Sequence, residues 1–444
     1  MACRVVTVAG TIEEGYSDGP GHEARFQNPL EMTLTADGSL LVADYGNHCI
    51  RQIDQYGIVS GYAGCPGKTG RTDGPKSSAL FNGPMGLCIT RDGSEIVGDS
   101  GNNVIRKIST SGIVSTLITS PTASSKRASA YSSYRLSTAG PCSSIRVCTN
   151  LSNGNSSNDD GDGDRDDDDN EFLYVCHGLN LLKFDLSTGC NISTVLMSPQ
   201  PSPVFSGAST HIQSMTCATS MEQTSLFVAE RSGGRVLMVT EDNKSTTMAA
   251  SSWEDLDKSV VKVLGDGLSG VAVDDYGYMY ISNLNVNYIA TISPRLAGGV
   301  LAGQDKSGIS DEIATNALFG KISRLFYDSD SHCLYVSQRH SIRKVILPMR
   351  PLAPEQQRIL QRVRKVTDEG IGTDVVFHVD GDTRKIYAVT SLLCANSEYF
   401  KAMFNSSMKE STVAETKQPI VVKSTSYEAF RAVITWVMYG VEIV

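Results

Sequence analysis

The stretch VADYGNHCIRQID, from Val42 to Asp54, decides the fold because it recurs about 55 residues later as VGDSGNNVIRKIS, from Val97 to Ser109. Taken alone, its Asp, Asn, His and Cys lie within six residues and resemble a catalytic or metal-binding cluster. In the second copy, however, an asparagine replaces His48 and a valine replaces Cys49. A period of this length is typical of repeat architectures. The stretch therefore indicates a structural repeat, and His48 and Cys49 are not repeated ligand positions.

The repeat extends upstream of this stretch and occurs six times. GYSDGPGHEARFQNP at residues 15–29 aligns with GRTDGPKSSALFNGP at 70–84 and with SGISDEIATNALFGK at 307–321. The weaker copies between them alternate apolar and polar residues and end in polar turns, so each copy contains about four short strands. A sheet of four strands leaves its two edge strands without hydrogen-bonded neighbours. Arranging several such sheets around a common axis leaves only short, protected edges. We predict a mainly β chain with a six-bladed β-propeller at residues 4–347.

The two ends of the repeat region complement each other. The chain begins with RVVTVAG, which matches the fourth strand of a copy, and the last copy stops at Leu347 before it supplies that strand. We therefore predict that Val5 to Ala9 completes the sixth blade and closes the ring.

The third copy carries an insertion at residues 120–171. It is rich in serine and then runs NDDGDGDRDDDDNE. Such a segment is too polar and too charged to bury a core. We expect a disordered loop across this range.

Two stretches of the repeat region carry a family resemblance. DGSLLVADYGNHCIRQID and GPMGLCITRDGSEIVGDSGNNVIRKIS resemble NHL repeats, with Asn47, His48 and Cys49 at the place of the Asn-His-Leu that names them. The resemblance implies a propeller platform rather than one activity. Propellers similar to NHL repeats include protein-binding modules, RNA-binding modules, and lyases or lactonases that use a metal near the central channel.

One column of the repeat makes an enzyme worth considering. The six copies place a polar residue at equivalent positions, namely Asp44, Asp99, His177, Glu230, Asn283 and Gln338. A ring of these side chains at the channel could hold a hard cation. The favoured interpretation is that each ends its strand and accepts backbone N–H bonds in the following turn. We predict no catalytic residue, no bound metal and no cofactor.

The pattern changes after Leu347. Residues 348–370 form a Pro-rich linker with a short amphipathic helix. From Thr373 to about Gly440, the stretches DVVFHV, SLLCANSEYFKAMF and YEAFRAVITWVMYG closely resemble the BTB (POZ) domain. The resemblance implies a small α+β interaction module at residues 371–444, which dimerises and in many family members binds cullin scaffolds of ubiquitin ligases. The chain stops at Val444, so we expect a BTB domain without its last helices.

Two motifs of the BTB family fall on particular residues. Met408, Lys409 and Glu410 supply an apolar-x-Glu pattern that the resemblance assigns to cullin binding. A solvated loop explains the same three residues equally well. Asp374 matches the acidic residue of the family's dimer pocket, but Val389 and Thr390 replace its usual charged neighbours. We expect Asp374 to be partly solvated or capped by backbone N–H groups, because an unpaired buried carboxylate is costly.

Composition and net charge limit the classes of partner that the protein can bind. The 444 residues carry a formal net charge of −9, which argues against nucleic-acid binding. One basic cluster, formed by Arg339, His340, Arg343 and Lys344, leaves an RNA-binding propeller as an alternative. Without a signal peptide or a long apolar run, we expect a cytoplasmic protein, with the nucleus as an alternative.

The predicted function is that of a non-catalytic adaptor. The propeller binds a protein client, and the BTB domain joins it to a homodimer or heterodimer partner or to a cullin ligase. The alternatives are a metal enzyme that uses the polar column and an RNA-binding propeller.

Overall fold

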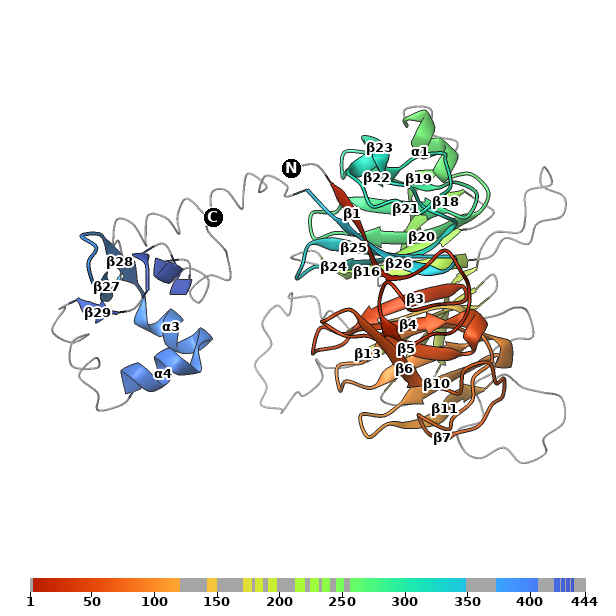
Figure 1. The fold of residues 1–444 in the computed structure, drawn as a ribbon, viewed down its shortest axis with the longest axis horizontal. Helices are drawn as coiled ribbons and strands as arrows, with labels where there is room; N and C mark the ends of the chain where they lie inside the picture. The colour runs from red at the N-terminus through yellow and green to blue at the C-terminus, as the bar shows by residue number, and fades with distance from the viewer. Residues whose placement is uncertain are drawn as a thin grey trace, which may run out of the picture. The chain divides into compact units, whose positions relative to one another are not determined.

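The computed structural model describes residues 3–119, 142–149, 171–177, 180–186, 191–197, 212–219, 224–230, 234–239, 245–250, 256–348, 373–405 and 419–434 without 424, 428 and 432 (Figure 1). The expected amphipathic helix of the linker and most of the insertion at 120–171 lie outside these residues. The chain divides into two compact units, Met1–Met349 and Arg350–Val444.

The described residues of the first unit form six antiparallel sheets, the blades of a propeller. Blade 1 contains, from the inside outward, β3 (Pro29–Leu34), β4 (Leu40–Asp44), β5 (Cys49–Ile53) and β6 (Ile58–Ala63). Blade 2 contains β8 (Pro84–Ile89), β9 (Glu95–Asp99), β10 (Val104–Ile108) and β11 (Ile113–Thr119). Blade 3 contains β12 (Cys142–Thr149), β13 (Glu171–His177), β14 (Asn180–Asp185) and β15 (Asn191–Met197).

Blade 4 contains β16 (Ile212–Thr219), β17 (Thr224–Glu230), β18 (Arg235–Val239) and β19 (Ser245–Ala250). Blade 5 contains β20 (Leu268–Val273), β21 (Met279–Asn283), β22 (Tyr288–Ile292) and β23 (Gly298–Gly303), and α1 (Lys258–Val263) precedes it. Blade 6 contains β24 (Ile322–Asp328), β25 (Cys333–Gln338), β26 (Ser341–Ile346) and, outermost, β1 (Arg4–Gly10).

The first strands of the blades line the central channel. Each contacts the first strand of the next blade, in the closed order β3, β8, β12, β16, β20, β24 and back to β3. The ring is closed by β1, which pairs with β26 so that Val5 faces Val345, and in Figure 1 the red β1 lies beside β26. The predicted completion of the sixth blade by the amino terminus is therefore confirmed.

Two details depart from the sequence prediction. Blades 1 and 2 each gain a short fifth strand at the outer edge, β2 (Gly19–Pro20) and β7 (Gly74–Pro75). Strand β12 lies inside the range assigned to the disordered insertion, because its alternating residues form the inner strand of blade 3. The insertion as delimited at 120–171 is therefore interrupted by a strand.

The stretch from Val42 to Asp54 folds as a strand, a tight turn and a second strand. Its turn contains the short 3-10 helix η1 (Tyr45–Asn47). In blade 2 the 3-10 helix η2 (Ser100–Asn102) follows β9, and η3 (Ala314–Asn316) precedes the first strand of blade 6. His48 ends η1 with φ 57°, and Asn103 ends η2 with φ 53°. Asn and His are among the residues that tolerate this left-handed conformation. His48 therefore occupies a turn position, and its Nδ1 accepts the Gly83 N–H at 2.9 Å.

The second unit contains a three-stranded sheet in the order β28 (Lys385–Ala388), β27 (Val375–Val379) and β29 (Ile420–Val422). Helices α3 (Thr390–Asn396) and α4 (Glu398–Asn405) follow β28, and a further helical stretch includes Tyr427 and Phe430. Phe377 of β27 packs edge-to-face against Phe400 and Phe430, with ring centroids 6.1 and 5.3 Å apart. These three aromatic rings join the helices to the sheet.

Candidate functional site

The polar column predicted as a channel ring lies on the second strand of each blade. Asp44 ends β4 and Asp99 ends β9, while β3 and β8 line the channel. Asp44 is fully buried and accepts the Gln27 N–H at 2.9 Å, the Asn47 side-chain amide at 2.7 Å and Arg51 Nη1 at 3.3 Å. Burial raises the pKa of Asp44 to about 6, although these donors oppose the shift.

Asp99 repeats this arrangement in blade 2. Its carboxylate accepts the Asn82 N–H at 2.7 Å, the Asn102 amide at 2.7 Å and Arg106 Nη1 at 3.1 Å. Burial raises the pKa of Asp99 as well. In both blades the aspartate holds the turn after its strand to the segment that enters the blade.

The buried arginine of each clear copy fixes a second carboxylate at the rim. Arg51 Nη2 lies 2.5 Å from Asp18 Oδ1, Arg106 Nη2 lies 2.7 Å from Asp73 Oδ1, and each guanidinium also donates to backbone carbonyl groups. Each stands about 5 Å from the ring of a buried phenylalanine, at 5.1 Å for Phe26 under Arg51. The repeated Arg therefore ties the incoming loop to the blade.

Blade 6 lacks the inner carboxylate. Gln338 accepts the Gly320 N–H at 3.1 Å and donates to Ser341 Oγ at 2.6 Å. Arg343 is fully buried, and within the described part of the chain its carboxylate partner is Asp311, 2.7 Å away. Burial lowers the pKa of Arg343. Asp311 therefore balances the charge of Arg343, and Gln338 stands where blades 1 and 2 have a second carboxylate.

The other members of the column also meet groups of their own chain. Asn283 Nδ2 donates to the Val263 carbonyl at 2.8 Å, and Asn283 Oδ1 accepts the Asn285 N–H at 2.8 Å. Glu230 Oε2 lies 2.6 Å from Arg235 Nη2. His177 ends β13, and its side chain lies outside the described part of the structure. Within the described residues, no group of three His, Cys, Asp or Glu side chains could hold a metal ion.

A different set of residues meets at the channel. Each is the third residue of the first strand of its blade and is buried, namely Glu31, Gly86, Ser144, Ser214, Gly270 and Arg324. Glu31 Oε2 lies 3.7 Å from Arg324 Nε, and Ser144 Oγ donates to the same oxygen at 3.2 Å. Arg324 Nη1 donates to the Ser269 carbonyl at 2.9 Å. A buried ion pair therefore joins the inner strands of blades 1 and 6.

This channel set has no signature in the sequence repeat, because its members differ from copy to copy. A column of Glu, Gly, Ser and Arg carries no common chemistry from copy to copy. The available signal was a charge in an otherwise apolar inner strand, Glu31 in PLEMTL and Arg324 in ISRLFYD. Buried charges of this kind are stable when paired.

The basic cluster considered for RNA does not form one exposed face. Arg343 is fully buried, and Lys344 is half-buried 5.1 Å from the Tyr335 ring. Burial and the neighbouring Arg339 charge lower the pKa of His340. Arg339 alone of the four is exposed. A basic patch with interleaved aromatics, which RNA binding needs, is absent at this described site.

In the second unit, Asp374 is exposed and precedes β27. Its Oδ1 accepts the Thr390 N–H at 2.7 Å, at the start of α3. A backbone N–H group thus takes the place of the charged neighbour that Val389 and Thr390 do not supply. Met408, Lys409 and Glu410, the predicted cullin contacts, lie outside the described residues.

Comparison with known proteins bears on both units. A model of the NHL repeat matches residues 26–53, and a model of the BTB/POZ domain matches residues 363–444. A structural genomics protein of unknown function from Bacteroides thetaiotaomicron is similar in fold, with a TM-score of 0.53, 13% identity and coverage of 78% of this chain and 76% of that one. At this identity the likeness concerns the fold alone.

Two curated proteins are similar in sequence over short stretches. Protein SUPPRESSOR OF QUENCHING 1, chloroplastic, of Arabidopsis thaliana is 35% identical over 94 residues, which are 21% of this chain. Trishanku of Dictyostelium discoideum is 42% identical over 69 residues, which are 16% of this chain. The matched stretch spans 9% of the length of each of these proteins. The chain carries an NHL repeat near its amino terminus, within a β-propeller, and a BTB/POZ domain at residues 363–444.

Proposed function

We propose that the protein is a non-catalytic adaptor. In this proposal the propeller binds a protein client, and the BTB domain provides dimerisation, with itself or another BTB protein, or recruitment of a cullin-type ubiquitin ligase. The observation that carries it is the combination of a propeller and a BTB/POZ domain in one chain. Both are interaction modules, and a module pair that binds two partners brings them together.

The geometry of the channel supports the adaptor over the enzyme alternative. In the described side chains of the predicted polar column, the polar groups contact the protein's own backbone and side chains. A catalytic centre usually combines a concave pocket with polar groups that converge on it. The buried Glu31 and Arg324 instead face each other at the channel.

The adaptor proposal is tested by co-purification of the full chain with a cullin. We expect retention of the cullin, and its loss in the Met408→Ala, Glu410→Ala double variant. Lys401→Ala, an exposed substitution on α4, serves as the control that should retain the cullin. If the cullin never binds, or binds the double variant unchanged, the ligase assignment is wrong. The molar mass of the chain in solution tests dimerisation separately.

The enzyme alternative has its own measurement. Metal content of the purified chain distinguishes it, because a metal centre on the column would bind zinc or calcium in stoichiometric amounts. We expect substoichiometric metal in the natural chain. A full equivalent that is lost in His177→Ala and Glu230→Ala variants would favour the enzyme over the adaptor.

A further inference from the structure

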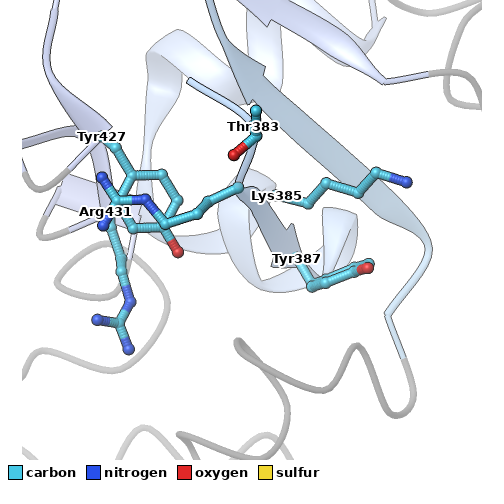
Figure 2. A pocket seen from close by; sticks show the side chains of 6 residues that line it. Thr383, Lys385, Tyr387, Tyr427 and Arg431 are labelled. Atoms are coloured by element: carbon cyan, nitrogen blue, oxygen red, sulfur yellow. The ribbon is translucent and has the colours of Figure 1, made fainter.

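The second unit has a basic hollow that neither the dimer nor the cullin proposal uses. Its volume is about 480 Å³, and Figure 2 shows its lining. The residues that line it are Thr383, Arg384, Lys385, Tyr387, Tyr427 and Arg431. Three of the six are cations, and none is a carboxylate. A hollow of this size accommodates several side chains of a ligand.

The strand β28 and the helical stretch that includes Tyr427 both contribute to the hollow. In each, the contributing residues are spaced so that they lie on one face of the element. Lys385 and Tyr387 alternate along β28, so both stand on the same side of the strand. Tyr427 and Arg431 lie four residues apart in the helical stretch, which places them on one helix face. The core contact between Phe377 and Phe430 holds that helical stretch against the sheet.

Arg384 is held in place by its neighbours. Its Nε and Nη2 donate to the two carboxylate oxygens of Asp382 at 3.0 and 2.7 Å, and its guanidinium lies 3.8 Å from the centroid of the Tyr427 ring. The same contact lowers the pKa of Asp382 to about 2, so the carboxylate stays ionised at neutral pH. Asp382 therefore engages Arg384, and the lining itself contains three cations and no carboxylate.

The directions of the cationic side chains favour an extended anion over a compact one. In Figure 2, the Lys385 and Arg431 side chains extend in different directions from the Tyr427 and Tyr387 rings. A compact anion such as phosphate would reach one of these cations at a time. A peptide with carboxylates on successive side chains could reach both, while its methylene groups pack on the two tyrosine rings.

We propose that this hollow binds an acidic peptide segment of a partner protein. Carboxylates of the peptide pair with Lys385 and Arg431, and the Arg384–Tyr427 stack forms part of the wall. This proposal does not rest on a client at the propeller or on a cullin at Met408 to Glu410. It gives the BTB unit a second binding site, which prefers negatively charged peptides.

The test measures binding of fluorescein-labelled octaglutamate to the full chain by anisotropy, with octaglutamine as the uncharged probe. We expect the glutamate peptide to bind and the glutamine peptide not to bind. The Lys385→Gln, Arg431→Gln double variant should bind about fivefold or more weakly, because the ion pairs of the exposed Lys385 and the half-buried Arg431 with the peptide are lost. Raising the salt from about 50 to about 300 mM should weaken binding of the natural chain, because screening reduces the attraction.

The control variant is Lys423→Gln. Lys423 is an exposed cation of the same unit that does not line the hollow, so this variant should bind within about twofold of the natural chain. A chain whose acidic run at 159–169 carries Asn in place of Asp removes competition from its own carboxylates. If the double variant melts earlier than the natural chain, each single variant replaces it.

Three results would overturn the proposal. The first is no binding of octaglutamate to either form of the chain. The second is an equal loss in the Lys423→Gln control, which means that general charge attracts the peptide. The third is complete displacement by an equal concentration of inorganic phosphate, which means that the hollow takes a compact anion and not a peptide.

Discussion

The propeller contains a matched pair of buried arginines that differ in one charge. Arg106 contacts Asp73 at 2.7 Å and Asp99 at 3.1 Å, whereas Arg343 contacts Asp311 at 2.7 Å and has Gln338 at the place of Asp99. The outer carboxylates are equivalent, with side chains 50% exposed for Asp73 and 46% for Asp311. Each also accepts N–H and hydroxyl groups of one threonine, Thr116 or Thr7.

We predict that Asp311→Asn destabilises the chain more than Asp73→Asn does. The amide keeps an acceptor oxygen in both variants and removes the charge. Arg106 retains Asp99, so the loss is that of a half-exposed pair, about 1 kcal/mol. Arg343 is left buried without a contacting carboxylate, which costs about 3 kcal/mol, the lower end of the range for breaking a buried pair because Asp311 is half-exposed.

The difference of about 2 kcal/mol corresponds to a melting temperature about 3 °C lower for Asp311→Asn than for Asp73→Asn in a unit of this size. Thermal unfolding of the full chain, followed by circular dichroism in the β region, measures it. Adding Gln338→Asp to Asp311→Asn should restore part of the loss, because it returns an inner carboxylate to Arg343. Equal melting temperatures, or no recovery on adding the aspartate, would refute this account of the charge balance.

Three further predictions concern single positions. Glu31→Gln leaves Arg324 charged and buried, so we expect a loss of about 3 to 5 kcal/mol in unfolding free energy, and Glu31→Leu combined with Arg324→Met should recover most of it in the same denaturation assay. The raised pKa of Asp44, about 6, means that the folded chain holds a proton that the unfolded chain releases between about pH 4 and pH 6. The stabilising contribution of Asp44 is therefore full below about pH 4 and is lost as the pH rises through 6. The unfolding free energy of the natural chain relative to that of Asp44→Asn should fall by about 2 to 3 kcal/mol between those pH values. A difference between the melting curves of the two chains that does not change with pH would contradict this. Phe430→Ala removes a ring that packs on Phe377, so the second unit should lose about 3 kcal/mol or more, read as faster amide exchange in β27 with exchange in β4 unchanged.

The blade order and the closing strand followed from the sequence because both rest on local patterns. A strand of alternating residues looks the same wherever it sits in the ring, and RVVTVAG matched the fourth strand without any knowledge of its partner. In the structure, Asp44 is the last residue of β4 and Asp99 the last residue of β9. The radial position of the polar column was not available, because a repeat gives the angle around the ring and not the distance from the axis.

The pairings that differ between copies could not be predicted. Glu31 meets Arg324 only because blades 1 and 6 become neighbours when the ring closes, and the two residues are far apart in sequence. The basic hollow has the same character, since Lys385 and Arg431 come from a strand and a helix that a separate aromatic contact brings together. Sequence patterns indicate which residues are charged, and tertiary packing decides which charges meet.

The pairing of β1 with β26 bears on the order of events during synthesis. The ribosome makes β1 before the strands of the first five blades and makes β26 after them, roughly 20 to 70 s later at ordinary elongation rates. During that interval the alternating apolar residues of β1 have no strand beside them, and an unpaired edge invites contacts with other nascent chains. The pairing of β1 with β26 therefore makes the yield of folded protein sensitive to how long β1 waits for its partner strand.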